Sequence, residues 1–377
     1  MKIRIERDTF ADAVAWAART LPARSAVPVL AGLHLSADAD LITISSFDQD
    51  VSGRAWLPAS TLEPGSTLVS GRLLADIARA LPSAPLTLQT EGSRLSITCG
   101  RAAFTLPTLP IEEYPQLPAM PDSSGTLPGA LFASAVAQVA IAASRDDTLP
   151  VLTGIRMEFE GSSMTLAATD RYRLAVRELT WTPSTDALQA HLLVPARALG
   201  DTAKSLAGAD EVHLALGSQT GAAGLVGFEG AGRRTTTRLL DGEFPKYRTL
   251  LPAEVSSTAR VDTAMLADAV KRVSLVAERN TPVKLAFSSD EVVLRAGAGE
   301  DAQASEALEC TLQGDDIEIA FNPAFLLDGL AAVDSSITHL SFTQSTRPAV
   351  LVGLTEAGAE PTQEYRYLLM PVRLTNG

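Results

Sequence analysis

The chain has 377 residues, of which 46% are hydrophobic and 20% are charged, and it carries a net charge of −13 at neutral pH. This composition is that of a globular chain with two or three domains, and it excludes intrinsic disorder. The acidic balance argues against a surface that is basic throughout, but a local cationic patch can still attract nucleic acid. The charged start "MKIRIERDTF" and the lack of a long apolar run predict a cytoplasmic protein without a signal peptide or membrane span.

A helical segment and the strand after it occur twice with one spacing. The first helix is expected over Asp8–Leu21, before "VPVLAGLHL", and the second over Gly129–Ser144, before "LPVLTGIRM". Residues 122 positions apart match without a gap, which indicates an internal repeat. The matching pairs are Ala13 and Ala135, Val14 and Val136, Pro28 and Pro150, Leu30 and Leu152, Gly32 and Gly154, and Asp48 and Asp170.

A third, fainter copy begins with a helical run over Asp262–Glu278, which again contains an alanine-valine pair, Ala269-Val270. Short alternating segments between the helices predict antiparallel strands. A second helix is expected in each copy, over Ser70–Leu81, Pro195–Leu206 and Asn322–Val333. We therefore expect an α+β protein of three repeated domains, 1–122, 123–253 and 254–377, each with two helices packed on antiparallel sheets.

The stretch "ATDRYRLAVRE", residues 168–178, predicts a hairpin whose turn is Thr169–Arg171. In its second strand, one face would carry Tyr172, Leu174 and Val176, and the other Arg173, Ala175 and Arg177. On spacing alone a solvated face is the simplest interpretation of these arginines. A binding surface is the alternative.

Two of the helices carry cations at matching places. Arg72 and Arg79 lie seven residues apart on one second helix, as do Arg197 and Lys204 on the next. Because seven residues return nearly to the same helix face, each helix would expose two stacked cations opposite buried leucines. Solvation explains one such face, whereas the recurrence favours a cationic inner wall that attracts phosphates without reading bases. Cations near the first helices are Arg19, Arg24, Arg145, Lys271 and Arg272.

The sequence lacks the motifs of the common enzyme classes. It has no P-loop, no GxSxG motif and no zinc-type cluster, and Cys99 and Cys310 stand apart as expected reduced thiols. A nuclease or phosphatase with paired aspartates stays an alternative, although aspartates at expected turns more often shape the backbone. The pairs are Asp48 and Asp50, Asp146 and Asp147, and Asp315 and Asp316. No catalytic residue, metal or cofactor is predicted.

Four segments and the threefold repeat resemble the bacterial DNA polymerase III beta subunit family, the sliding clamps. These segments are "ATDRYRLA", "GEFPKYRTLLP", "FNPAFLLDGL" and the terminal "YLLMPVRL", and "TDRYRLA" is most similar to actinobacterial clamps. The resemblance implies a non-enzymatic ring, a head-to-tail homodimer that encircles double-stranded DNA irrespective of its sequence. It also implies partners that bind through linear motifs: the polymerase III alpha subunit, the clamp loader, and other polymerases and repair proteins. A repeat scaffold that binds protein without DNA is the remaining alternative.

The resemblance further implies a peptide-binding groove between domains two and three. Its lining, carried over by position, would be Leu152, Thr169, Arg171, Tyr172, Arg173, Leu174, Pro245, Thr249, Leu250, Asn322, Phe325, Thr346, Met370, Pro371, Val372, Arg373 and Leu374. Leu152, Leu174, Pro245, Leu250 and Met370 would form an apolar slot for a leucine or phenylalanine anchor. Arg173 and Arg373 would hold peptide carbonyls or carboxylates at the rim.

For DNA, the resemblance implies contacts from Arg24 and from the loop Ser144–Leu149, beside the helix cations. The chain departs from many family members at Arg171-Tyr172, where Gly-His is common, and at Thr249, where a basic residue is common. These departures bear on which peptides bind. They leave open whether the chain is the replicative clamp or a divergent second copy that tolerates a clamp-binding antibiotic.

Overall fold

The computed structural model describes residues 1–22, 26–217, 224–252, 254–277, 281–297, 302–354 and 364–373. Residue contacts divide the chain into two compact units. Unit 1 is Met1–Ala133, Thr182–Thr185 and Asp201–Leu239, and unit 2 is Ser134–Trp181, Asp186–Gly200 and Leu240–Gly377. Helices α3 (Gly129–Ala140) and α4 (Ala196–Leu206) contribute residues to both units. No helix in the described residues is long and apolar enough to cross a membrane.

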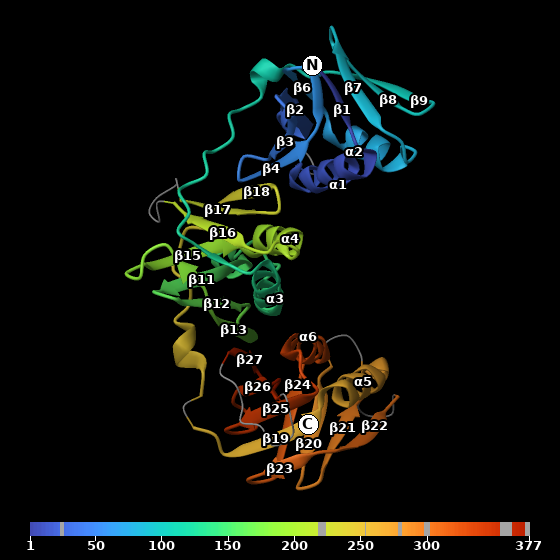
Figure 1. Cartoon of the computed structure of the whole chain (residues 1–377). Helices are drawn as coiled ribbons and strands as arrows, with labels where there is room; N and C mark the ends of the chain where they lie inside the picture. The colour runs from blue at the N-terminus through green and yellow to red at the C-terminus, as the bar shows by residue number, and fades with distance from the viewer. Residues whose placement is uncertain are drawn as a thin grey trace. The chain divides into compact units, whose positions relative to one another are not determined.

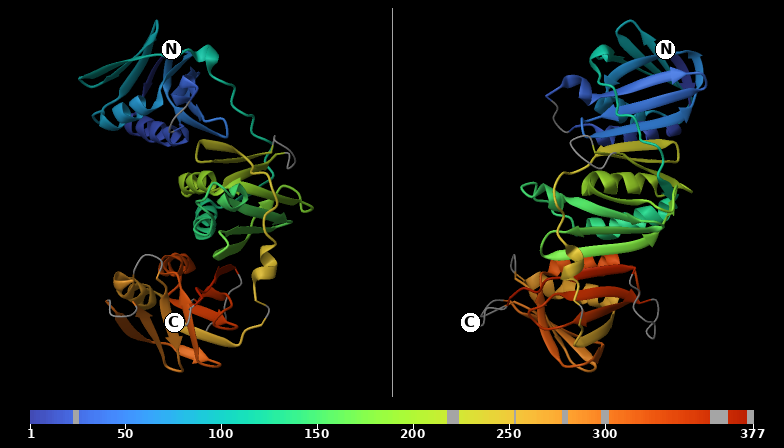
Figure 2. Two further views of the ribbon diagram at one scale, coloured as in Figure 1. Left: turned by 180° about the vertical axis from the view of Figure 1, so that it is seen from behind. Right: turned by 90° about the vertical axis from the view of Figure 1, so that its left-hand side faces the viewer.

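Unit 1 contains two antiparallel sheets (Figure 2). The five-stranded sheet is, in order, β5 (Ser60–Glu63), β1 (Lys2–Ile5), β7 (Leu86–Glu91), β8 (Arg94–Cys99) and β9 (Ala102–Pro107). The nine-stranded sheet is, in order, β14 (Thr182–Pro183), β10 (Gly125–Leu127), β16 (Val212–Leu216), β17 (Leu225–Gly230), β18 (Arg233–Arg238), β4 (Val51–Pro58), β3 (Leu41–Phe47), β2 (Gly32–Asp38) and β6 (Gly65–Ser70). Because β18 pairs with β4, this sheet joins strands of the first two repeats.

Helices α1 (Arg7–Ala17) and α2 (Gly71–Ala80) lie side by side against the strands of the first repeat (Figure 1). Their apolar residues, such as Phe10 and Leu74, share one core with strand residues such as Leu33 and Leu88. Helix α1 ends at Ala17, where a 3₁₀ turn takes over. The predicted helix was therefore correct in place and slightly too long.

Unit 2 repeats the plan with two further antiparallel sheets. The nine-stranded sheet is, in order, β15 (Gln189–Pro195), β11 (Gly154–Glu160), β12 (Ser163–Thr169), β13 (Arg173–Thr180), β27 (Tyr365–Leu369), β26 (Ala349–Leu354), β25 (Ile337–Phe342), β19 (Ser257–Asp262) and β23 (Thr311–Gln313). The four-stranded sheet is β22 (Ala304–Glu309), β21 (Glu291–Ala296), β20 (Val283–Phe287) and β24 (Ile317–Phe321). Helices α5 (Thr263–Val273) and α6 (Pro323–Val333) pack together, and β13 pairs with β27 as β4 pairs with β18 (Figure 1).

The repeat found in the sequence is present in the backbone. Asp48 Oδ1 accepts hydrogen bonds from the backbone N–H groups of Asp50 and Val51, and Asp170 Oδ1 accepts the same pair from Tyr172 and Arg173. The residue after each aspartate has a left-handed backbone, with φ of 89° at Gln49 and 80° at Arg171. The two aspartates therefore form one kind of turn in both repeats, which supports the turn interpretation of Asp48 over a catalytic one.

The described residues form six α-helices on antiparallel sheets, which confirms the predicted α+β class and its three repeated domains. Each 9-stranded sheet spans two repeats, so contacts divide the chain into two units instead of three. The boundaries near 122 and 253 stay a prediction.

Gly329 in α6 and Gly200 in α4 offer a matched test of this packing. A Cβ at Gly329 would overlap the ring of buried Tyr367, whereas a Cβ at Gly200 would meet no atom within 4 Å. We expect Gly329→Ala to lower the free energy of unfolding by about 1–3 kcal/mol, because overpacking strains the contact. Gly200→Ala should raise it by about 0.5–1 kcal/mol, because alanine favours a helix. Urea denaturation followed by circular dichroism measures both, and shifts in the same direction would contradict the packing.

Candidate functional site

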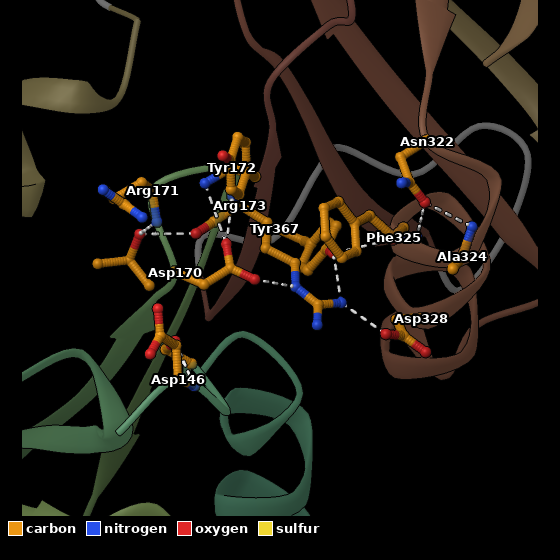
Figure 3. A network of polar contacts seen from close by, with 12 residues as sticks. Asp146, Asp170, Arg171, Tyr172, Arg173, Asn322, Ala324, Phe325, Asp328 and Tyr367 are labelled. Atoms are coloured by element: carbon orange, nitrogen blue, oxygen red, sulfur yellow. Dashed lines mark hydrogen bonds and ion pairs between the residues drawn. The ribbon is translucent and has the colours of Figure 1, made fainter. Parts of the chain in front are cut away.

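The hairpin of β12 and β13 places several predicted site residues at one turn (Figure 3). Strand β12 ends at Thr169 and β13 begins at Arg173, so the turn is one residue later than the sequence suggested. The Thr169 hydroxyl donates to the Arg173 carbonyl at 2.7 Å, and Asp170 Oδ1 accepts from Tyr172 N–H at 3.0 Å. Tyr172 therefore lies in the turn and not in the strand, because the aspartate side chain fixes the backbone around it.

Arg173 is buried, with 8% of its side chain exposed. Its Nε lies 2.9 Å from Asp170 Oδ2, and its Nη1 lies 2.5 Å from Asp328 Oδ2 on α6 (Figure 3). Burial by itself lowers the pKa of Arg173, but hydrogen bonds to Asp328, Tyr367 and Asp170 raise it above its ordinary value. The expectations of a solvated face and of Arg173 at an open rim are therefore wrong. Its guanidinium is charged and joins the hairpin to α6.

Phe325 is the aromatic centre of this contact. The Arg173 guanidinium carbon lies 4.3 Å from the centre of its ring, and the Tyr172 ring is stacked on it with centroids 6.1 Å apart. Tyr367 Oη donates to the Phe325 carbonyl at 2.8 Å, and Asn322 caps α6 by accepting from Phe325 N–H at 3.3 Å. Tyr172 itself is 57% exposed, so it presents an aromatic face to solvent beside α6.

The end of β27 closes the same region. Met370 N–H donates to the Tyr172 carbonyl at 2.9 Å, and Val372 N–H donates to the Ala320 carbonyl at 2.8 Å. These bonds bring together the hairpin, β24 and the last described residues. Leu374, also predicted in this groove, lies outside the described residues.

The predicted groove residues divide into a covered floor and an exposed rim. Leu174 packs with Tyr247 and Leu368 under the linker residues Phe244 and Leu251. The buried residues are Leu152, Thr169, Arg173 and Leu174. The exposed rim is Arg171, Tyr172, Pro245, Thr249, Leu250, Thr346, Met370, Val372 and Arg373, and Asn322, Phe325 and Pro371 are partly buried.

The predicted DNA-facing cations that the structure describes are exposed, on helices or next to them. Leu74 and Leu199, on the opposite faces of α2 and α4, are fully buried. The exposed cations are Arg19, Arg72, Arg79, Arg145, Arg197, Lys204, Lys271 and Arg272, and Arg24 lies outside the described residues.

Acidic neighbours offset some of these cations. Arg79 lies 3.3 Å from Asp76 and Lys271 lies 3.0 Å from Asp268. Arg272 makes two hydrogen bonds to Glu306 of β22, which raise its pKa, at 3.0 and 2.6 Å. The phosphate-binding role predicted for Arg272 is thus weakened by a carboxylate that lies far away in sequence.

One of the paired aspartates, Asp146, has structural partners in its own loop. Asp146 Oδ1 accepts from the Thr148 N–H at 3.0 Å and from its hydroxyl at 2.7 Å, and these bonds lower the pKa of Asp146. Among the described residues, no group of three or more histidine, cysteine or acidic side chains could hold a metal ion. The Asp146 carboxylate thus acts on its own turn, as that of Asp48 does.

Sequence reasoning missed Asp170, Asp328 and Tyr367 as partners of Arg173. The aspartate in the apolar helix segment "FLLDGL" was the one available signal, because a charge there needs a partner. Its partner lies 155 residues away, and no local pattern predicts it.

We expect Arg173→Met to lower the free energy of unfolding by about 2–4 kcal/mol, because it leaves the largely buried Asp170 without its cation. Arg171→Met, on the same turn, should change it by less than about 0.5 kcal/mol, because Arg171 is exposed. Urea denaturation of the two variants measures the difference. Equal stability would show that the buried ion pairs do not hold the hairpin.

Comparison with known proteins gives a match along the whole chain. Residues 1–118, 126–246 and 248–373 match the N-terminal, central and C-terminal domains of the DNA polymerase III beta subunit. The beta sliding clamp of Streptomyces coelicolor is 59% identical over 375 residues and 100% of both chains, and the beta sliding clamp homolog GriR of Streptomyces muensis is 45% identical over 99% of both. The crystal structure of the Bacillus subtilis sliding clamp superposes with a TM-score of 0.91 at 26% identity over 100% of both chains. The chain therefore belongs to the DNA polymerase III beta subunit family, the beta sliding clamps, which are processivity factors without a catalytic site of their own.

Proposed function

We propose that two copies of this chain close head to tail into a ring around duplex DNA in the cytoplasm. The ring tethers the polymerase III alpha subunit, the clamp loader, and other polymerases and repair proteins. The proposal depends on one observation: the described part of the chain has two different unpaired strand edges. When one edge of each copy pairs with the other edge of its partner, the contact is heterologous, and such contacts form a ring if the rotation between the copies brings the chain of contacts back to its start.

The two edges are β9 in unit 1 and β22 in unit 2, each with one strand neighbour among the described strands. An unpaired strand edge is a template for pairing with another chain. Exposed Arg94 and Arg101 flank β9, and β22 carries Glu306 and Glu309, so the two edges differ in charge. Leu275, in the 3₁₀ turn Ser274–Val276 that follows α5, is 85% exposed and adds apolar surface near β22, against which α5 packs.

DNA would bind through the exposed helix cations. Arg197 and Lys204 on α4 have no ion pair with the residues that the structure describes, and Leu199 between them is buried. Such cations contact phosphates, which carry no sequence information, so the ring could move along DNA of any sequence. The net charge of −13 is compatible with this, because phosphates respond to the local field.

The groove of unit 2 would receive short linear peptides of the partners. Tyr172, Leu250, Met370 and Val372 expose 57%, 48%, 40% and 37% of their surface, an apolar rim suited to leucine or phenylalanine anchors. Arg171 and Arg373 stand exposed beside it without ion pairs to described residues, ready to bind peptide carbonyls or carboxylates.

We infer that this chain is the replicative clamp rather than an antibiotic-tolerant second copy. It is 59% identical to the relative named beta sliding clamp and 45% identical to the relative named as its homolog GriR. The higher sequence identity to the first relative, over the full length of the chain, favours the replicative role.

Retention on DNA of different topology tests the function. We expect the protein, loaded on nicked circular DNA by a clamp loader, to stay bound through gel filtration, because a closed ring leaves a circle only by opening. Cutting the circle once should release it. A protein that stays bound after linearisation, or is never retained on the circle, would exclude the encircling ring.

We expect Leu275→Asp to weaken dimerisation by about tenfold or more, since it places a charge in an apolar contact near acidic β22. Leu62→Asp is the matched control. Leu62 is 60% exposed on β5, which is the edge strand at the other side of the five-stranded sheet from β9. Sedimentation equilibrium of both variants gives the dissociation constants. Equal dissociation constants for the two variants would show that the interface does not include Leu275.

A further inference from the structure

A hollow of about 250 Å³ lies beside the proposed groove in unit 2. Two residues of β11, Arg156 and Glu158, and the linker residues 244–249 line it. The linker residues include Pro245 and Thr249, which the groove also uses. The hollow therefore shares two lining residues with the predicted groove.

Strand register places the hollow on the same sheet face as the floor of the groove. Arg156 is opposite Ala167, and Thr169, two residues further along β12, is opposite Leu174. Residues two apart on a strand share a face, and diagonal neighbours on adjacent strands lie about 7–8 Å apart. An extended peptide rises about 3.3 Å per residue, so two or three residues bridge the distance.

The lining carries more positive than negative charge. Arg156, Lys246 and Arg248 stand against one carboxylate, Glu158, which leaves an excess of two positive charges. A further acid on this face, Glu178, is paired with Arg366. The hollow thus carries positive charge inside an acidic protein.

The Glu158 carboxylate is already occupied within the protein. Its Oε2 accepts from Tyr247 Oη at 2.9 Å and lies 2.8 Å from Arg248 Nη2, and its Oε1 lies 3.3 Å from Arg156 Nε. Burial and the bond to Glu158 raise the pKa of Tyr247, which keeps its hydroxyl a donor. Lys246 is exposed and has no ion pair with any described residue, so its charge is available to a ligand.

We propose that this hollow binds an acidic side chain of the tethered peptide, an aspartate or glutamate two or three residues from its apolar anchor. The inference rests on the proposed function of the groove and adds a selection rule to it. A carboxylate suits the hollow because Lys246 and the arginines are donors that Glu158 leaves partly unused. Among peptides with equal apolar anchors, the clamp would therefore prefer those with a nearby acid.

Fluorescence anisotropy with the full-length protein tests this preference. The probes are two labelled synthetic peptides with a leucine-phenylalanine anchor, one with an aspartate three residues before it and one with an asparagine there. We expect the aspartate peptide to bind about 5- to 10-fold more tightly at low salt, as charge-assisted hydrogen bonds allow. The ratio should fall as salt rises, because partly exposed charges are screened.

The variant Lys246→Ala with Arg156→Leu should reduce the ratio to less than about twofold. Lys284→Ala is the matched control, since Lys284 is an exposed lysine on β20 away from the hollow, and it should keep the full ratio. Equal affinities for the two peptides on the unchanged protein, or an undiminished ratio in the double variant, would overturn the proposal. Binding of neither peptide would instead refute the groove itself, and this inference with it.

Discussion

The site in unit 2 depends on one buried charge, the guanidinium of Arg173 between Asp170 and Asp328. Taking an arginine out of water is costly unless carboxylates and hydrogen bonds surround it, and here both are present. Asp170 belongs to the hairpin and Asp328 to α6, so the charge is satisfied only when these two elements meet. The ion pairs therefore specify which turn of α6 faces the hairpin, and Phe325, Tyr172 and Met370 take their places around that contact.

The internal repeat explains why an apolar rim forms at one junction and not at the other. In unit 1, Arg238 N–H donates to the Asp50 carbonyl at 2.9 Å, as Met370 N–H donates to the Tyr172 carbonyl at 2.9 Å in unit 2. The backbone arrangement is shared, but the side chains differ. Arg238 contacts the turn of the β3–β4 hairpin, with Nε 3.2 Å from the Gln49 carbonyl, whereas Met370 is exposed. At this position one repeat thus makes a polar contact, and the other leaves an apolar side chain exposed.

Local patterns predicted the elements and missed the long-range pairs. The helices were placed to within a few residues, because their apolar periodicity and proline positions are local properties of the chain. The shared turn of Asp48 and Asp170 was visible as a spacing of 122 residues. The burial of Arg173 was not visible in the sequence, because its partner Asp328 is 155 residues away. The pairing of Arg272 with Glu306, 34 residues away, was not visible either. Whether an arginine is a binding group or a structural one depends on such partners, and the fold alone supplies them.

Neighbouring carboxylates also decide which other cations of the chain stay available for a ligand. Acidic residues outnumber basic ones, 44 to 31, so a cation near a sheet or helix usually finds a carboxylate, as Arg79, Lys271 and Arg272 do. A cation that keeps its charge for a ligand must stand where no carboxylate pairs with it, as Lys246 and Arg373 do among the described residues. Because the field of an exposed charge fades over about 10 Å in salt, these few residues would decide what the proposed groove attracts, whatever the net charge. The surplus of acid elsewhere then favours specificity, since it repels acidic ligands from every surface that lacks such cations.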